Sequence, residues 1–413
     1  MYAFNDLIVR TYIIFLLTNN FLASADPPSA NYDKLQQYKH DISVPINDFT
    51  LKIFKQLLDS KTGNILWSPF LVSISLSFIQ MADKMNSTEK IQSLLYPSVS
   101  WELFHHSFTE YLKTVQDLSN FQLSNKLYID PVLLPNININ ISKYYFLEID
   151  EINPRTIGKL SDKFHKNRIS NFMSFGNSNE EIFAVLVNSL HFQGFWENQF
   201  NRKFTMRETF YVTEKQTEVV EMMYTENYFA IKSDERFSFR SLEIPLAGNR
   251  FSFYIILPDD IEGITSIEKQ LTSRLLWQII ANKASPRNVA LILPKFQMKS
   301  NFTFQDILFK ETTDHLFNLE NNNLTNTHVH LIDILHQGFL NFNELGTTSS
   351  PATVRKSSHL IEKKAKHETS FTVNHPFLFF IVDKTSFMIL HVGKCTHPDS
   401  STVPHQQNTH DEL

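Results

Sequence analysis

The sequence predicts a single α+β domain, because helical patterns fill its first half, strand patterns fill its second half, and no linker divides them. Of its 413 residues, 42% are hydrophobic and 20% are charged, as in a globular protein with a substantial core. The chain has 37 Phe and only 9 Gly. Phenylalanine can build core, and glycine this scarce marks positions where the backbone needs it.

The first helical pattern opens at Ser43-Val44-Pro45 and ends at Thr62-Gly63. Its apolar residues recur at helical spacing and share one face: Ile46, Phe49, Ile53, Phe54, Leu57 and Leu58. Residues 74–81 and 101–118 also predict helices. A further pattern around 157–173 carries scattered Lys and Arg side chains, which we interpret as a solvated face; binding of a polyanion is the alternative.

Short apolar runs in the second half predict buried strands over residues 184–192, 251–257 and 289–293. Two more runs, 377–382 and 387–394, are joined by the turn 383–386 and predict a C-terminal hairpin. Cys395 lies at the end of that hairpin. It is the only cysteine, so it forms no disulfide within the chain, and we expect it to be a small buried side chain.

Both ends of the chain have the pattern of a targeting signal. Residues 1–25 combine Arg10, an apolar run and a small-residue cleavage site after Ala25, which is typical of a secretory signal peptide. A polar tail, residues 399–413, ends in the tetrapeptide that the retrieval receptor of the endoplasmic reticulum binds: His410, Asp411, Glu412 and Leu413. We therefore expect a protein of the endoplasmic reticulum lumen, or a secreted one, with that receptor as a partner.

Four glycosylation sequons fit this route: Asn86, Asn140, Asn301 and Asn323. No later run reaches the about 20 apolar residues of a membrane span. The net charge of −5 and the lack of a basic stripe with aromatics argue against nucleic acid as a partner. We expect a monomer.

Motifs of known enzyme classes are missing from the sequence: it has no nucleophile elbow, no phosphate-binding glycine loop and no zinc-protease helix. His328 and His330, with Asp333 and His336 nearby, resemble a metal site, but strand alternation puts Asp333 on the opposite face. We interpret these as ordinary polar positions. The sequence thus predicts a protein that is not an enzyme and that has no metal and no cofactor.

Residues 343–381 carry the strongest functional signal. Every residue from Gly346 to Thr353 is small or a proline, a polar basic run follows to His367, and a dense apolar run begins after His375-Pro376. A loop of this length is uncommon in a compact domain and is usually functional or disordered. Its first side chains are small enough to enter an existing sheet. We therefore predict a long exposed loop that inserts as a strand.

Six segments together resemble the serpin family. Residues 332–344 resemble the strand that leads into the reactive loop, and Gly346-Thr347-Thr348 resembles the hinge of that loop. Residues 64–69 resemble the early Ser-Pro helix start of the family, and residues 188–196 resemble its Asn-x-x-x-Phe-x-Gly-x-Trp signature. Residues 293–296 and 375–377 resemble two further motifs that complete the set. The resemblance covers residues 40–398 in family order and implies helices around a large mixed central sheet with an exposed reactive loop.

This resemblance implies a suicide substrate for a serine protease. The protease attacks a loop bond and forms an acyl-enzyme. Before deacylation, the cut loop inserts as a new central strand and distorts the protease. About a dozen inserted residues that gain ladder bonds at ~1 kcal/mol each amount to on the order of 10 kcal/mol. That is comparable with the whole stability of a domain, ~5–15 kcal/mol, so the native fold is expected to be metastable.

Family spacing from Gly346 places the reactive bond at Leu360–Ile361, which suits a chymotrypsin-like protease. Counting back from His375 instead leaves Lys363, Lys364 and Lys366, which suit a trypsin-like protease; the alternative interpretation of these lysines is a solvated loop. The resemblance also implies a polar cluster beneath the opening sheet, made by Ser68, Asn188 and His336, with Trp196 near the top of the opening. Leu71 replaces a hydroxyl often found in that cluster, which puts its hydrogen bonding in question.

The hinge departs from the pattern of inhibitors. We assign it Glu344, Gly346, Thr347, Thr348, Ser349, Ser350, Pro351, Ala352 and Thr353. Leu345 and Thr348 stand where inhibitors usually have acidic residues, and Pro351 lacks the N–H that a central strand needs. Slow insertion would let the protease escape. The alternative is therefore a non-inhibitory binding protein or chaperone of the endoplasmic reticulum lumen, similar to the collagen-binding member of the family.

Overall fold

The computed structural model describes residues 39–82, 88–116, 121–129, 139–151, 184–281, 284–303, 331–347 and 369–398, with single residues 118 and 131. Its helical elements are η2 (Lys39–Ser43), α3 (Val44–Ser60), α4 (Pro69–Ala82), α5 (Thr88–Leu95), α6 (Trp101–Gln116), α7 (Ile139–Tyr144), η5 (Arg202–Phe204), α9 (Ile264–Gln270) and α10 (Ser273–Ile280). No helix of these residues is long and apolar enough to cross a membrane.

The strands form two large sheets. They are β1 (Ile65–Trp67), β2 (Phe121–Ile129), β3 (Leu147–Glu151), β4 (Ala184–Phe192), β5 (Gly194–Phe195), β6 (Met206–Tyr211), β7 (Thr217–Asp234), β8 (Phe239–Pro245), β9 (Phe251–Pro258), β10 (Arg287–Pro294), β11 (Phe296–Thr303), β12 (Leu331–Asn343), β13 (Gly346–Thr347), β14 (Ser370–Thr372), β15 (Phe377–Asp383) and β16 (Met388–Cys395). Helices packed on a mixed sheet confirm the predicted α+β class.

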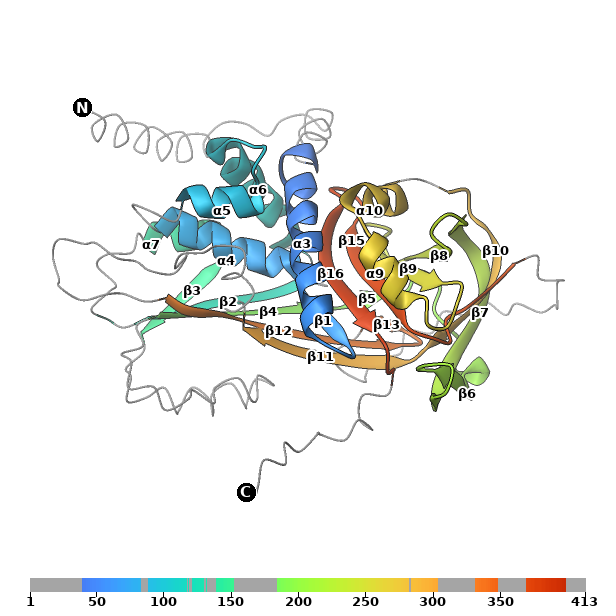
Figure 1. Ribbon diagram of the computed structural model, residues 1–413. Helices are drawn as coiled ribbons and strands as arrows, with labels where there is room; N and C mark the ends of the chain where they lie inside the picture. Colours follow the sequence, from blue (N-terminus) through green and yellow to red (C-terminus); the bar gives the residue numbers. More distant parts are fainter. Residues whose placement is uncertain are drawn as a thin grey trace, which may run out of the picture.

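The first sheet has the order β3-β2-β4-β12-β13-β5, and β11 pairs with β12. Its two central strands, β4 and β12, run parallel, whereas β2 and β11 run antiparallel to the central strand that each one joins. Helices α4 to α7 lie along one face of this sheet (Figure 1). The parallel pair brings together two segments that lie far apart in the chain, β4 and β12.

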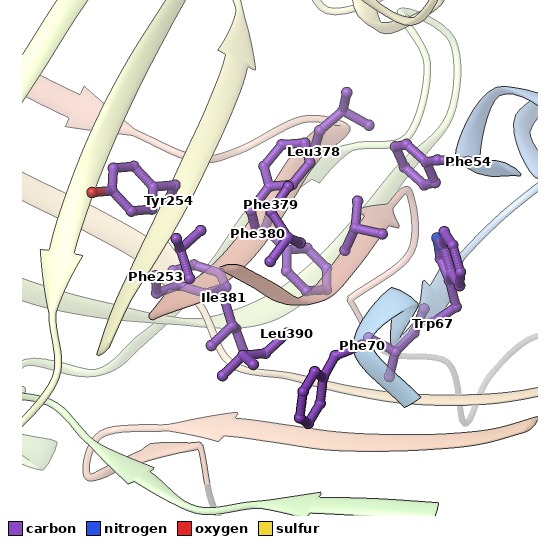
Figure 2. Close-up of a cluster of buried hydrophobic side chains, with 14 of the residues drawn as sticks. Phe54, Trp67, Phe70, Phe253, Tyr254, Leu378, Phe379, Phe380, Ile381 and Leu390 are labelled. Atoms are coloured by element: carbon purple, nitrogen blue, oxygen red, sulfur yellow. The ribbon is translucent and has the colours of Figure 1, made fainter. Parts of the chain in front are cut away.

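The second sheet has the order β1-β16-β15-β9-β8-β7-β10-β14, and β6 pairs with β7. Its middle strands are mostly apolar, and every residue of β9, β15 and β16 is buried. Figure 2 shows Phe253 from β9 beside Phe379 and Phe380 from β15, with Phe54, Trp67 and Phe70 from the N-terminal elements closing the other side. The many phenylalanines thus form the contact between the two sheets and the helices.

The predicted helices and strands agree closely with the structure. The amphipathic pattern that opens at Ser43-Val44-Pro45 forms α3, and the run 184–192 forms β4 with the same ends. The helix predicted over 74–81 begins earlier, at Pro69, and the one predicted over 101–118 ends at Gln116. The helix predicted around 157–173 lies outside the described residues. Cys395 is a buried free cysteine, as predicted.

Candidate functional site

The candidate site is the seam between the parallel strands β4 and β12. These strands pair from Ala184 with Leu331 to Leu190 with Gly338. Beyond that point a third strand lies between their extensions: β13 pairs antiparallel with the end of β12 and antiparallel with β5, which follows β4 after one residue. The seam is therefore already occupied at one end by the first residues of the loop.

The hinge residues of β13 are fixed by close backbone contacts. Gly346 has φ +139°, and a Cβ added there would lie 2.1 Å from the carbonyl oxygen of Gly194, so no other residue fits. Thr347 is fully buried, and its Oγ1 accepts a hydrogen bond from the Gly194 N–H at 2.8 Å. The Leu345 carbonyl accepts one from the Trp196 N–H at 2.9 Å. Gly346 and Thr347 thus hold strand positions while the loop is intact.

Glu344 anchors the approach to the hinge. Its buried carboxylate accepts a hydrogen bond from the Thr205 hydroxyl at 3.0 Å and lies 3.4 Å from the Lys295 ammonium. Its backbone carbonyl accepts the Phe200 N–H at 3.0 Å. Burial alone raises the pKa of Glu344, but hydrogen bonds from its own backbone and Thr205, together with Lys295, outweigh burial and hold that pKa below the ordinary value. The ionised carboxylate is the stable form here.

The substitution Glu344→Gln tests this anchor. It removes the charge that faces Lys295 and weakens the accepted hydrogen bonds, so we expect a loss of about 1–2 kcal/mol of unfolding free energy near pH 7. Because the folded pKa is depressed, the loss should fade as the pH falls through that pKa, where wild type is itself protonated. Urea titrations at several pH values measure this.

Glu221→Gln is the matched control, since Glu221 pairs with the same Lys295 at 3.1 Å but is largely exposed. An exposed pair contributes little, about 0–1 kcal/mol. Equal losses for the two variants at neutral pH would contradict an anchoring role for Glu344.

Trp196 lies at the end of the seam where β12 turns into β13. The buried indole donates its Nε1–H to the Asn343 carbonyl at 2.8 Å, and its ring stacks 6.3 Å from Phe342. Phe342 in turn lies 4.3 Å from Phe296 and 4.8 Å from Phe253, measured between ring centroids. An aromatic cluster therefore holds the end of β12 just before the chain turns into the hinge.

The polar cluster predicted beneath the seam is assembled around Ser68. The Ser68 N–H donates to Nε2 of His336 at 2.9 Å, and its hydroxyl donates to the Leu390 carbonyl at 2.6 Å. His336 stands opposite Asn188 in the register of β12 and β4. Burial lowers the pKa of His336 to about 3, so the ring is neutral and its Nε2 acts as an acceptor. The structure thus brings Ser68, Asn188 and His336 together.

The question raised by Leu71 is answered by a residue that the sequence analysis did not single out. The Asn188 side-chain amide donates to the Leu71 carbonyl at 2.9 Å and also to the hydroxyl of Ser75, one helical turn further along α4. The leucine contributes its backbone, and Ser75 supplies the hydroxyl. This arrangement ties β4 to α4.

Several predicted residues lie outside the described part of the chain. They are the signal segment 1–25, the hinge residues 348–353, the candidate reactive-bond residues Leu360, Ile361, Lys363 and Lys364, the sequons Asn86 and Asn323, and the tail with His410, Asp411, Glu412 and Leu413. The remaining sequons, Asn140 and Asn301, lie in α7 and β11. The described residues hold no group of three or more His, Cys, Asp or Glu placed to bind a metal.

This geometry defines a protein whose loop starts as a strand at one end of a parallel seam in its main sheet. The chain belongs to the serpin family: the family model described as serpin (serine protease inhibitor) matches residues 45–398. Among its relatives are Serpin B4 of Homo sapiens, 27% identical over 87% of this chain and 100% of that protein, and the leukocyte elastase inhibitor of Homo sapiens, 27% identical over 85% and 97%.

Solved serpin structures have the same fold. Uncleaved ovalbumin superposes with a TM-score of 0.75 at 21% identity, covering 87% of this chain and 100% of that one. Human kallistatin superposes with a TM-score of 0.75 at 20% identity, covering 87% and 99%. The family description and the name of the elastase inhibitor are those of protease inhibitors, not enzymes.

Proposed function

We propose that this protein inhibits a serine protease as a suicide substrate, through cleavage of the loop after β13 and insertion of that loop into the β4–β12 seam. The observation that carries the proposal is β13 itself. Because only the turn residues 344–345 separate the loop from β12, a loop strand paired with β12 must run antiparallel to it, and β13 does run antiparallel to β12 and to β5. It therefore has the direction and position of the first two residues of such a strand.

The register that β13 sets supports insertion of the following residues. Continued unchanged, it places Thr353 opposite His336 on β12 and, independently, opposite Asn188 on β4. His336 and Asn188 are themselves paired across the seam, so the register from β12 and the register from β5 are consistent. One inserted strand can therefore pair with β12 and β4 at the same time. The full length of β12, Leu331–Asn343, is then matched by Gly346 to Ser358. After full insertion, Leu360 would lie two residues beyond the last paired residue, at the opposite end of the sheet from the hinge. A protease bound covalently to Leu360 would be moved to that end.

Two residues of the loop oppose complete insertion. Pro351 would lie opposite Gly338 and, lacking an N–H, would lose one ladder bond of about 1 kcal/mol. Arg355 would lie between Leu186 and Ile334, which are both fully buried. A buried charge without a partner costs far more than a missing ladder bond. Arg355 is therefore the main obstacle, and insertion should proceed readily only as far as Val354.

These obstacles favour a second candidate function, a non-inhibitory binding protein. In that case the loop is cut without trapping the protease. The proposed location, the lumen of the endoplasmic reticulum or the exterior, suits both functions, and the retrieval receptor is a proposed partner in both. The proposed protease is chymotrypsin-like if the cut falls at Leu360 and trypsin-like if it falls at Lys363 or Lys364.

The deciding experiment cleaves the loop of the purified protein and compares thermal unfolding before and after, with the cut mapped by mass spectrometry. Insertion worth on the order of 10 kcal/mol should raise the Tm by about 10–15 °C in a chain of this size. A panel of chymotrypsin-like and trypsin-like proteases is tested in parallel for covalent complexes that survive denaturing electrophoresis.

The variant Arg355→Leu sharpens the experiment. It removes the buried charge, so it should increase both the Tm rise and the yield of covalent complex. Lys356→Leu is the matched control, because strand alternation points that side chain to the opposite face. If wild type and Arg355→Leu both give only clean cleavage with no rise in Tm, inhibition is excluded. The binding function is then tested with triple-helical collagen peptides.

A further inference from the structure

His391 is a buried polar residue that the proposed function does not use. It lies in β16 and is fully buried, and neither of its ring nitrogens has a hydrogen-bond partner among the described residues. Its ring is 6.2 Å from that of Phe192 on β4, measured between centroids, and it interacts electrostatically with His336 on β12. His391 therefore lies near both strands of the seam.

The surroundings of His391 offer no countercharge among the described residues. Across β15 it faces Ile381, and the neighbouring Val392 pairs with Trp67 of β1. Helix α4 contains no ionisable residue. The charged residues of α3 are exposed or half-buried: Asp48, Lys52, Lys55 and Asp59. Asp383, on β15, is already bonded to Arg250. The titratable group facing His391 is His336, which would repel it if both were protonated.

Burial keeps this pair neutral while the seam is closed. Burial, together with the smaller effect of His336, lowers the pKa of His391 to about 3, and burial lowers the pKa of His336 to about 3 as well. Opening of the seam exposes the rings to water, where a histidine pKa returns to ~6.5. The open state then binds more protons than the closed state at any pH between these values. Opening is therefore favoured as the pH falls below ~6.5.

We propose that His391, together with His336, makes the β4–β12 seam acid-sensitive, so that acidification opens the sheet where the loop strand enters. The effect is about tenfold in the opening equilibrium for each exposed imidazole between about pH 7.5 and about pH 5.5. As a regulatory device it rests on the proposed function, because strand insertion gives the opening its consequence. The opening itself is a property of the uncleaved protein and can be measured without any protease.

Native-state hydrogen exchange of the full-length, uncleaved protein tests the proposal. The exchange of peptides from β4 and β12 is measured at about pH 7.5, 6.5 and 5.5 and divided by that of β8, in the other sheet. This ratio removes the intrinsic dependence of exchange on pH. In wild type the ratio should rise by up to about a hundredfold between the extremes, because two imidazoles are exposed.

His391→Phe and His391→Leu should each reduce that rise to about tenfold, the part due to His336. Two variants are used because one apolar side chain can fail to pack at this position. His106→Gln, at an exposed position of α6, should behave as wild type. If both His391 variants keep the full wild-type rise, the proposal is wrong. Failure to form protease complexes, by contrast, would reject the proposed inhibition and leave this measurement unaffected.

Discussion

Under the proposed mechanism, replacing Thr347 by arginine should turn the proposed inhibitor into a substrate that the protease cleaves and releases. Thr347 is fully buried between β12 and β5, and its hydroxyl is bonded to Gly194. An arginine would have to bury an unpaired charge before the rest of the loop could follow, at a cost of several kcal/mol. Since each 1.36 kcal/mol added to the barrier is tenfold in rate, insertion should slow by about a hundredfold or more.

The measurement is the fraction of protease that ends in a covalent complex, together with the fraction of Thr347→Arg that is cleaved and released. We expect cleavage at the wild-type rate and almost no complex. Thr348→Arg is the control, because alternation along a strand points that side chain away from the core. If Thr348→Arg were as damaging as Thr347→Arg, the charge would be acting on the loop in general and not at the seated hinge.

The predicted elements agree best with the structure where the residue pattern within one short segment is enough to define a helix or strand. The run 184–192 is mostly apolar and strand-forming, and the apolar face of α3 repeats at helical spacing, so both could be recognised locally. Helices α9 and α10 and the strand β1 were not predicted. Each has only three to eight residues, and β1 exists because Ile65–Trp67 pairs with β16, more than 300 positions away.

The residues of the candidate site also fall into those that the sequence could predict and those that it could not. The resemblance to serpins supplied Ser68, Asn188, His336 and Trp196, because these residues sit within recognisable motifs. Ser75 was missed: nothing near it in the sequence points to Asn188, which lies 113 positions away. The isolation of His391 could not be predicted either, because the lack of a partner depends on everything packed around the ring. Sequence patterns identify residues within a motif more easily than a buried residue whose side chain lacks a hydrogen-bond partner among the described residues.

Removing the carboxylate of Asp383 should destabilise the native fold by about 3–5 kcal/mol, the usual cost of breaking a buried ion pair. Asp383 is fully buried at the end of β15. Its Oδ2 accepts hydrogen bonds from Arg250 at 2.9 Å and 3.1 Å and from the Tyr111 hydroxyl at 3.1 Å. Its Oδ1 accepts the N–H and hydroxyl of Thr385 at 2.9 Å and 2.6 Å.

This carboxylate joins three parts of the fold: α6 through Tyr111, the start of β9 through Arg250, and the turn between β15 and β16 through Thr385. In Asp383→Ala the guanidinium keeps only its bonds to Thr114, and the buried Tyr111 hydroxyl loses its acceptor. A loss of 3–5 kcal/mol is a large part of the ~5–15 kcal/mol that stabilises a domain. If the native state is metastable, as the proposed mechanism requires, this loss leaves little free energy to keep it folded.

Urea unfolding of Asp383→Ala, Arg250→Met and the double variant measures the network. The double variant should be less destabilised than the sum of the two single variants, because it leaves neither charge unpaired. Asp234→Ala is the control, since Asp234 pairs with the exposed Arg236 at 3.5 Å and should lose less than about 1 kcal/mol. Strict additivity of the two single losses would mean that Asp383 and Arg250 act independently. The hairpin would then be held by apolar packing alone.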